Sequence, residues 1–282
     1  MRPVASVVIP AHNEETVLPR LLAALSDGAA DLDVVVVANA CEDRTAEVAK
    51  AAGVRVLETP VAGKPHALRL GDAECEVFPR IYLDADVVLT GEGVRALADA
   101  LAEPGVLMAT PTVVLDCRGV TWFARRVHRA WAALPQVRST GVGSGAYGLS
   151  AAGHARVFPI PDVLTDDAWA HRKISLRSKV VVAGAWSVVR PAGSAQALLR
   201  RRARVRLGHR ELDRLGVTAS REHGSGLRVI ARLIRARRVA VVDAACLISV
   251  ALLDRVIATF RRINGNETGW FTDTKSRIEP ER

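Results

Sequence analysis

Short apolar runs alternate with amphipathic segments over the first 83 residues, and this alternation constrains the fold more than any other feature of the chain. The first run, Val4 to Ile9, is continuous and rich in valine, which is typical of a strand buried on both faces of a parallel sheet. Leucines at helical spacing follow it. Three further runs are Leu32 to Ala38, Val54 to Leu57 and Arg80 to Leu83. This order predicts an α/β fold with a doubly wound, mostly parallel sheet flanked by helices.

Composition limits the classes of partner and cofactor. The chain has 282 residues, of which 49% are hydrophobic, and its net charge of +9 favours acidic partners such as nucleotide phosphates or anionic lipid. Four scattered cysteines without a CxxC pair argue against a zinc site and fit a reducing cytosol. No GxGxxG follows the first predicted strand, which disfavours a dinucleotide-binding domain, and GxxxxGK[ST] is absent from the sequence. The N-terminus leads straight into the first strand, so we expect no signal peptide and a cytoplasmic location.

Two carboxylates, Asp84 and Asp86, stand where the fourth predicted strand ends. In open α/β sheets, ligands bind outside the carboxyl ends of the strands. Carboxylates suit Mg²⁺ or Mn²⁺, and a cation held by one or two of them usually completes its shell with phosphate oxygens. An isolated Asp-x-Asp is more often a solvated turn, so its meaning depends on the surrounding motifs.

The second half of the sequence is less regular. Val106 to Leu115 is expected to form one or two strands interrupted by Pro111, and Val120 to Leu134 is expected to be a helix. Two short strands are predicted to follow, Lys179 to Ala183 and Ala185 to Val189. Between these regions lie a glycine-rich loop, which permits close approach of a ligand, and a second acidic pair.

A basic helical region is predicted from Ser194 onwards. A second basic stretch, Arg232 to Arg238, precedes an apolar helix that runs from Val239 to about Phe260. Its apolar part is shorter than the roughly 20 residues of a membrane span. Two placements stay open for this helix, against the preceding domain or on the anionic inner face of a membrane. The tail after Asn264 is polar.

Five motifs, taken in order, resemble the inverting glycosyltransferase family 2, whose members have the GT-A fold and use nucleotide sugars. The resemblance covers about residues 4 to 205. The motifs are Val8-Ile9-Pro10-Ala11-His12-Asn13-Glu14-Glu15, the turn Asn39 to Thr45, the D-x-D of Asp84-Ala85-Asp86, the acidic Thr165-Asp166-Asp167, and Gln196 followed by Arg200-Arg201-Arg202. Each motif is weak alone, whereas their order on the predicted strand ends is specific.

The resemblance implies a metal-dependent transfer of one sugar from a nucleotide-sugar donor to an acceptor hydroxyl, with inversion. It implies Mn²⁺ or Mg²⁺ on Asp86 and Asp84, and Asp167 as the catalytic base. Because adjacent side chains diverge, we expect only one acid of the pair in the pocket, with Asp166 orienting the base or capping a helix that begins at Ala168. The implied nucleotide-sugar site comprises Pro10, Ala11, His12, Glu14, Asn39, Lys64, Asp84, Ala85, Asp86 and Gly145. Further candidates are Trp169, which could stack on a sugar or pack in the core, Arg201 and Arg202.

The resemblance also implies the partners and the domain organisation. A UDP-sugar is the preferred donor and GDP- or dTDP-sugars are alternatives, because Asn39 replaces the usual aspartate and can donate as well as accept. The acceptor is a small or lipid-linked hydroxyl compound, and nucleic acid is not an expected partner. The arginine run lacks the tryptophan of processive polymer synthases, which favours transfer of a single sugar. We expect a catalytic domain over 1–193, with a nucleotide-binding half at about 1–116 and an acceptor half at about 117–193, and a basic helical extension over 194–282.

Two rival functions stay open at this point. Sugar-phosphate nucleotidyltransferases use a similar sheet, but they carry a G-x-G-T/S-R loop where this chain has Pro10 to Glu14. A non-catalytic nucleotide- or lipid-binding protein could also keep the fold, although the intact Asp84, Asp86 and Asp167 weigh against it. Release of a nucleoside diphosphate from a donor would separate an enzyme from a binding protein.

Overall fold

A computed structural model describes residues 3–27, 31–218 and 226–263 of the chain. Its strands are β1 (Ala5–Ala11), β2 (Leu32–Asn39), β3 (Arg55–Thr59), β4 (Arg80–Leu83), β5 (Met108–Leu115), β6 (Ala146–Leu149) and β7 (Lys179–Val189). Its helices are α1 (Leu18–Ser26), α2 (Thr45–Ala51), α3 (Lys64–Ala73), α4 (Gly91–Ala102), α5 (Trp122–Ala132), α6 (Pro135–Thr140), α7 (Ala151–Val157), α8 (Asp166–Lys173), α9 (Ala195–Arg214), α10 (Leu227–Arg235) and α11 (Val241–Ile263). The polar tail expected over 264–282 lies outside the described residues.

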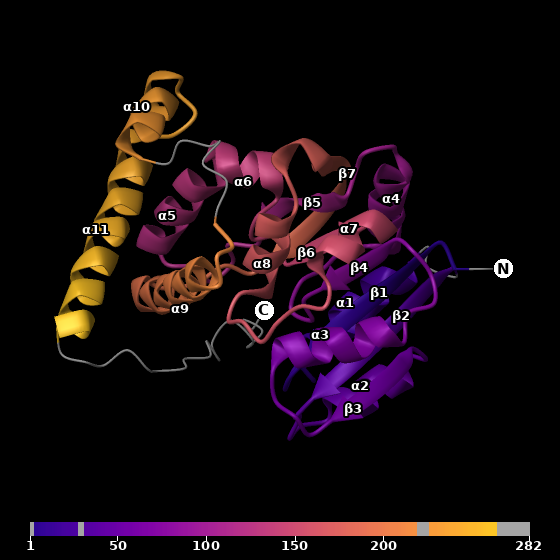
Figure 1. Cartoon of the computed structure of the whole chain (residues 1–282). Coiled ribbons are helices and arrows are strands. Elements are labelled where there is room, and N and C mark those ends of the chain that lie inside the picture. Colours follow the sequence, from indigo (N-terminus) through magenta and orange to yellow (C-terminus); the bar gives the residue numbers. More distant parts are fainter. Residues whose placement is uncertain (1–2, 28–30, 219–225, 264–282) are drawn as a thin grey trace.

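The described strands form one seven-stranded sheet in the order β3-β2-β1-β4-β6-β5-β7 (Figure 1). β6 runs antiparallel to both of its neighbours, β4 and β5, and the other paired strands are parallel. The predicted mostly parallel α/β sheet is therefore confirmed. The parallel strands β1, β2 and β4 all end at the same edge of the sheet, which is where a ligand site is expected.

Helices cover both faces of the sheet. Because side chains alternate along a strand, Val7 and Ile9 of β1 enter one core layer and Val8 enters the other. α1 and α4 pack on the first layer, whereas α3, α7 and α8 pack on the second. All three valine and isoleucine side chains are fully buried. Burial of such a side chain stabilises the fold by about 1.5–3 kcal/mol relative to its exposure.

The edge pair β5 and β7 differs from the expectation of two short strands. β7 is a single strand that runs parallel to β5, with Val182 opposite Pro111 and Trp186 opposite Thr112. The three residues between Val182 and Trp186 therefore form a bulge rather than a turn. The expected interruption at Pro111 appears as this shift of register, because proline cannot donate to the ladder of hydrogen bonds.

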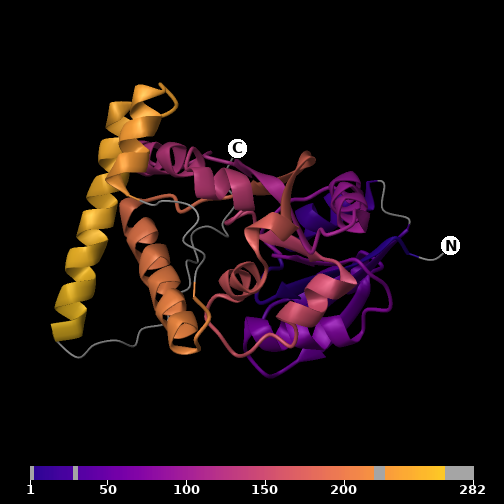
Figure 2. The same cartoon turned by 45° about the horizontal axis from the view of Figure 1, so that its top comes forward.

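The helices α9, α10 and α11 form a layer at one end of the molecule, and α11 is outermost in both views (Figures 1 and 2). These helices share a hydrophobic core with α5. Two buried aspartates fix the inner face of α11, since Asp243 lies 3.1 Å from Arg126 and Asp254 lies 3.3 Å from Arg202. One face of the apolar helix is therefore packed on the rest of the protein.

The outer face of α11 is apolar and exposed. Its exposed side chains include Val241, Val242, Leu252, Leu253 and Val256. Across the described ranges, none of the helices is both long enough and apolar enough to span a bilayer.

Candidate active site

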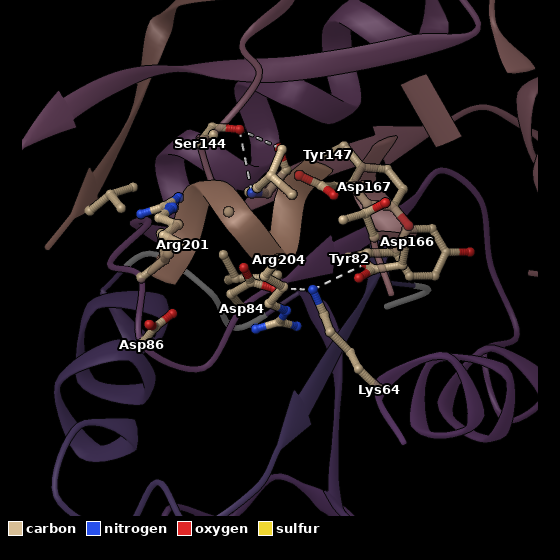
Figure 3. Close-up of a pocket in the computed structure, with 18 of the residues that line it drawn as sticks. Lys64, Tyr82, Asp84, Asp86, Ser144, Tyr147, Asp166, Asp167, Arg201 and Arg204 are labelled. Atoms are coloured by element: carbon tan, nitrogen blue, oxygen red, sulfur yellow. Dashed lines mark hydrogen bonds and ion pairs between the residues drawn. The ribbon is translucent and has the colours of Figure 1, made fainter. Parts of the chain in front are cut away.

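A cavity of about 270 Å³ lies at the carboxyl end of β4, with walls from β6, α8 and α9 (Figure 3). Its charged wall residues come from segments far apart in the sequence, namely Lys64, Asp84, Asp86, Asp166, Asp167, Arg190, Arg200, Arg201 and Arg204. Of the residues that the sequence predicted for the site, the cavity brings together Lys64, Asp84, Asp86, Gly145, Asp166, Asp167 and Arg201. The two acidic pairs are brought together by the fold, because 80 positions separate Asp86 from Asp166.

The D-x-D motif enters the cavity on a turn after β4. The N–H of Val87 donates to the carbonyl oxygen of Asp84 at 3.2 Å, which closes the turn. Asp84 and Asp86 line the cavity, whereas Ala85 between them is buried in the core. Gly145 fixes the turn from the neighbouring segment, because its carbonyl oxygen accepts the N–H of Asp84 at 2.8 Å. With a φ of +64° and with a Cβ that would overlap Val87, this position requires glycine.

Lys64, the first residue of α3, links the two acidic pairs. Its Nζ lies 2.7 Å from Asp84 Oδ1 and 3.0 Å from Asp166 Oδ2 (Figure 3). Burial alone would lower the pKa of Lys64, but the carboxylates of Asp166, Asp84 and Asp167 outweigh burial and raise this pKa. Lys64 is therefore a permanent cation at the centre of a carboxylate cluster.

The two acids of the second pair open α8, and they differ in exposure. Asp166 is only 5% exposed, and burial raises its pKa although Lys64 opposes the shift. Asp167 is exposed, and its Oδ1 accepts the N–H of Ala168 at 2.7 Å. Two predictions are wrong here, because the helix begins at Asp166 rather than Ala168 and both acids line one cavity. Their side chains do diverge by about 100° around the helix, but the cavity extends over both.

Two tyrosines in the cavity wall are absent from the predicted site. The hydroxyl of Tyr82 donates to Asp72 at 2.6 Å, whereas the buried hydroxyl of Tyr147 has no hydrogen-bond partner among the described residues. Burial raises the pKa of Tyr147, and the nearby carboxylates raise it further, so this hydroxyl stays protonated. Both residues could have been predicted from strand alternation, because residues two positions apart on a strand point to the same face. Tyr82 stands two positions before Asp84, and Tyr147 stands two positions after Gly145.

The helix α9 supplies a basic wall. Arg200, Arg201 and Arg204 line the cavity, and Arg190, just after β7, joins them. Arg202 was predicted for the site but does not line the cavity; its Nε lies 3.3 Å from Asp254 of α11. Consecutive residues of a helix point about 100° apart, so one arginine run serves two faces. The same spacing identifies Arg204, three positions after Arg201, which the sequence analysis missed.

The residues predicted to contact the nucleoside lie at the ends of β1 and β2, outside this cavity. The Nδ1 of His12 lies 2.7 Å from the carbonyl oxygen of Asn39. The Asn39 amide donates to the carbonyl of Val61 at 2.6 Å and accepts the N–H of Gly63 at 2.9 Å. Asn39 therefore positions the loop that leads into Lys64. Nucleoside contacts stay a prediction for Pro10, Ala11, His12, Glu14 and Asn39.

Trp169 packs against α7 and is not part of the cavity wall. Its Nε1 donates to the carbonyl of Val157 at 2.9 Å, and the Nζ of Lys173 lies 4.7 Å from the centre of its ring. Trp169 follows Asp167 by two positions, which turns it about 200° around the helix and away from the acid. Of the two roles proposed from the sequence, the structure favours packing.

Comparison with known proteins places most of this framework in one family. The family described as Glycosyl transferase family 2 matches residues 6–158, more than half of the chain. A curated relative, the 4,4'-diaponeurosporenoate glycosyltransferase of Staphylococcus haemolyticus, is 37% identical over 94 residues, which cover 31% of this chain and 25% of the relative. The chain therefore matches about a quarter of the length of that relative.

Solved structures share the fold at lower identity. A mannosyltransferase from Pyrobaculum calidifontis, in complex with GDP-Man and Mn²⁺, superposes with a TM-score of 0.59 at 19% identity, over 95% of this chain and 84% of that chain. A glucosyl-3-phosphoglycerate synthase from Mycobacterium tuberculosis, in complex with Mn²⁺, UDP-glucose and phosphoglyceric acid, gives a TM-score of 0.50 at 23% identity, over 78% of this chain and 81% of that chain. The predicted GT-A fold class is confirmed by these likenesses.

Proposed function

The chain belongs to glycosyl transferase family 2 and is a glycosyltransferase, and from that premise we propose that it moves one sugar from a nucleotide-sugar donor to an acceptor hydroxyl, with inversion and with Mn²⁺ or Mg²⁺. One observation carries the proposal: the carboxylates at the end of β4 and those at the start of α8 line a single cavity and are linked there by Lys64. Such an arrangement can hold a diphosphate at one acidic pair and an acceptor hydroxyl at the other.

Asp84 and Asp86 are the residues that would hold the cation. Their oxygen donors suit Mn²⁺ and Mg²⁺. Within the described part of the chain, no group of three or more His, Cys, Asp or Glu side chains is placed to hold a metal ion. Two carboxylates fit a cation that takes its remaining ligands from water and from the phosphates of the donor. When bound, the cation would offset the charge of the departing nucleoside diphosphate.

Asp167 is the proposed general base. The acceptor oxygen forms a bond to the anomeric carbon while the bond from that carbon to the diphosphate oxygen breaks, and the diphosphate leaves with the electron pair. The acceptor proton passes to a carboxylate oxygen of Asp167. Asp167 is exposed in the cavity, whereas Asp166 is buried and paired with Lys64, so Asp167 is the better placed of the two to meet an acceptor. Attack from the face opposite the leaving group inverts the stereocentre.

The donor nucleotide is proposed to be a uridine diphosphate sugar, with GDP- and dTDP-sugars as the alternatives. Both polar groups of the Asn39 amide already bond to the loop before Lys64. The nucleobase of the donor would therefore be recognised mainly by backbone groups at the ends of β1 and β2 rather than by a free side chain. The two solved structures of the same fold hold GDP-Man and UDP-glucose with Mn²⁺, and a test panel therefore includes both nucleotides.

Calorimetric titration with UDP, GDP and dTDP tests the proposal, in Mn²⁺ and again with EDTA. We expect one nucleotide to bind at least tenfold more tightly with the cation. Asp86→Ala should abolish that gain, because a methyl group cannot ligate a cation. Glu103→Ala is the matched control, since Glu103 is an exposed acid at the end of α4. Metal-independent binding and turnover would refute the metal assignment, and mass spectrometry of products from a panel of nucleotide sugars would identify the donor.

We also propose that the outer face of α10 and α11 touches an anionic membrane. α11 exposes apolar side chains, and exposed arginines at 232, 235, 237 and 238 precede this helix in the chain. A basic residue near an anionic surface contributes roughly 1 kcal/mol. The protein should float with vesicles that contain phosphatidylglycerol at low salt, and Leu252→Ser with Leu253→Ser should weaken this. Absence of flotation with anionic vesicles would leave the outer face without this role.

A further inference from the structure

Arg190 after β7 and Arg200, Arg201 and Arg204 of α9 form an arginine wall on the same cavity as the four carboxylates. We propose that this arginine wall binds an acidic group of the acceptor, so that the acceptor is a hydroxyl compound that also carries a phosphate or a carboxylate. The inference rests on the proposed sugar transfer and names the class of its acceptor.

The direction of the α9 side chains is the first reason. Arg202 and Arg206 both turn to α11, where they pair with Asp254. Arg201 and Arg204 turn to the cavity, and neither makes a hydrogen bond or an ion pair with any residue that the structure describes. The helix therefore satisfies the charges on one face with a carboxylate and leaves two guanidinium groups facing the cavity (Figure 3).

Repulsion within the wall is the second reason. Arg201 and Arg204 are three positions apart and Arg200 and Arg204 four apart, so they are neighbours on the helix surface. Like charges at these spacings destabilise a helix. An anion between them would remove this repulsion, and guanidinium groups match the geometry of phosphate and carboxylate oxygens.

The balance of charge is the third reason. Five cationic side chains and four carboxylates line the cavity, and Lys64 is already bound to two of those carboxylates. A nucleotide-sugar diphosphate has two negative charges, which a divalent cation offsets. Arg190 Nε lies 3.7 Å from Asp116 outside the cavity, so the charge of the wall that lacks a carboxylate partner among the described residues is that of Arg201 and Arg204. Binding of the donor with its cation leaves these two charges in place, and a further anionic group would neutralise them.

The position of the wall assigns this group to the acceptor. A Cβ atom at Gly208 would overlap the side chain of Thr165, so α9 touches the start of α8 at this point. Arg204 is one turn before Gly208, about 6 Å along the helix, and Arg201 is about 4–5 Å farther. Because Asp167 follows Thr165 by two positions, the wall begins close to the proposed base. The hydroxyl and the acidic group of the acceptor should then be about 5–10 Å apart.

Inorganic phosphate is the probe for the test. It is titrated into the full chain saturated with Mg²⁺ and with the nucleoside diphosphate that binds. We expect Arg201→Gln with Arg204→Gln to weaken phosphate binding at least tenfold, since the variant loses charge-assisted hydrogen bonds to the anion. Affinity for the nucleoside diphosphate should change less than twofold. Arg210→Gln is the matched control, because Arg210 is an exposed arginine of α9 outside the cavity wall and should bind phosphate like the wild type.

Two acceptor arms distinguish the source of the anion. Glycerol phosphate in solution represents a free phosphorylated compound, and phosphatidylglycerol vesicles represent a lipid headgroup. Labelled sugar should reach one of these fractions, should not reach glycerol, and should fall at least tenfold in the double variant but not in Arg210→Gln.

Several outcomes would overturn the inference. Equal use of glycerol and glycerol phosphate would show that the acceptor needs no acid. Loss of nucleoside diphosphate affinity in the double variant would assign the wall to the donor. A loss of phosphate affinity in Arg210→Gln equal to that in the double variant would show that phosphate responds only to the overall positive charge of α9. Metal-dependent nucleotide binding without any phosphate binding would refute the acceptor class and leave the proposed sugar transfer intact, whereas absence of nucleotide binding would refute the sugar transfer itself.

Discussion

Replacement of Lys64 by methionine tests the electrostatic centre of the site. Lys64 Nζ lies 2.7 Å from Asp84 Oδ1 and 3.0 Å from Asp166 Oδ2, and methionine has a similar length without the charge. The variant leaves the carboxylates of the cavity without this cation. Because the two partners of Lys64 differ in exposure, the change should act mainly through one of them.

The size of the effect follows from that difference. The side chain of Asp84 is 37% exposed, so loss of its pair is worth at most about 1 kcal/mol. The side chain of Asp166 is 7% exposed, and breaking a buried pair typically destabilises a protein by about 3–5 kcal/mol. In the variant, Asp166 can take up a proton instead of remaining as an unpaired buried charge, so the free energy of that protonation is the most that loss of this pair can cost. For a carboxyl group with an ordinary pKa of 3.8, this limit is about 4 kcal/mol at pH 7 and about 2 kcal/mol at pH 5.

The dependence on pH has a definite sign. Burial already raises the pKa of Asp166, and removal of Lys64 raises it further. A carboxyl group whose pKa is higher in the folded protein favours the folded state at low pH and disfavours it as pH rises through that pKa. The variant should therefore be about 3–4 kcal/mol less stable than the wild type at pH 7 and about 1–2 kcal/mol less stable at pH 5.

Urea unfolding at the two pH values measures this difference. Lys64→Met with Asp166→Asn should regain most of the lost stability, because no buried charge is then left. Lys50→Met is the matched control, since Lys50 pairs with Glu58 on the surface and its loss should leave the stability close to that of the wild type. A loss below 1 kcal/mol at pH 7, or an equal loss at both pH values, would show that Asp166 does not depend on Lys64.

Two further predictions concern α8. Asp167→Asn should lower kcat by about 10²–10⁴-fold and leave nucleoside diphosphate affinity nearly unchanged, because a base meets the acceptor and not the diphosphate. Asp166→Asn should act mainly on stability. If Asp166→Asn were inactive and Asp167→Asn active, Asp166 would be the general base and Asp167 would not. Burial and Lys179 lower the pKa of His171 from 6.5 to about 4, so the wild type should lose stability as pH falls from 6.5 toward 4. That share is about 2 kcal/mol between pH 8 and pH 5, and urea unfolding should find it missing in His171→Gln; identical pH dependence in both proteins would refute the assignment.

The sequence alone determined the first four strands of the sheet and the acidic positions at its edge, but it did not predict β6 as a strand. A buried parallel strand needs a continuous apolar run, and the helix after it needs an apolar stripe, so both leave local patterns that can be read without the structure. The turn that follows β4 is local in the same sense, which is why Asp84 and Asp86 were found at the strand end. The order of motifs then gave the family, because strand ends that are distant in sequence meet at one edge of such a sheet.

Only the tertiary structure decided how two adjacent residues of one type are placed. Asp166 is buried against Lys64 while Asp167 is exposed, and Arg201 faces the cavity while Arg202 pairs with Asp254 of α11. Residue type is the same within each pair, so the local pattern does not predict which member is buried or paired, although the family resemblance favoured Asp167 as the base. The placement comes from the packing of α8 on the sheet and of α9 between the cavity and α11, because a helix directs neighbouring side chains about 100° apart and long-range contacts alone fix its rotation.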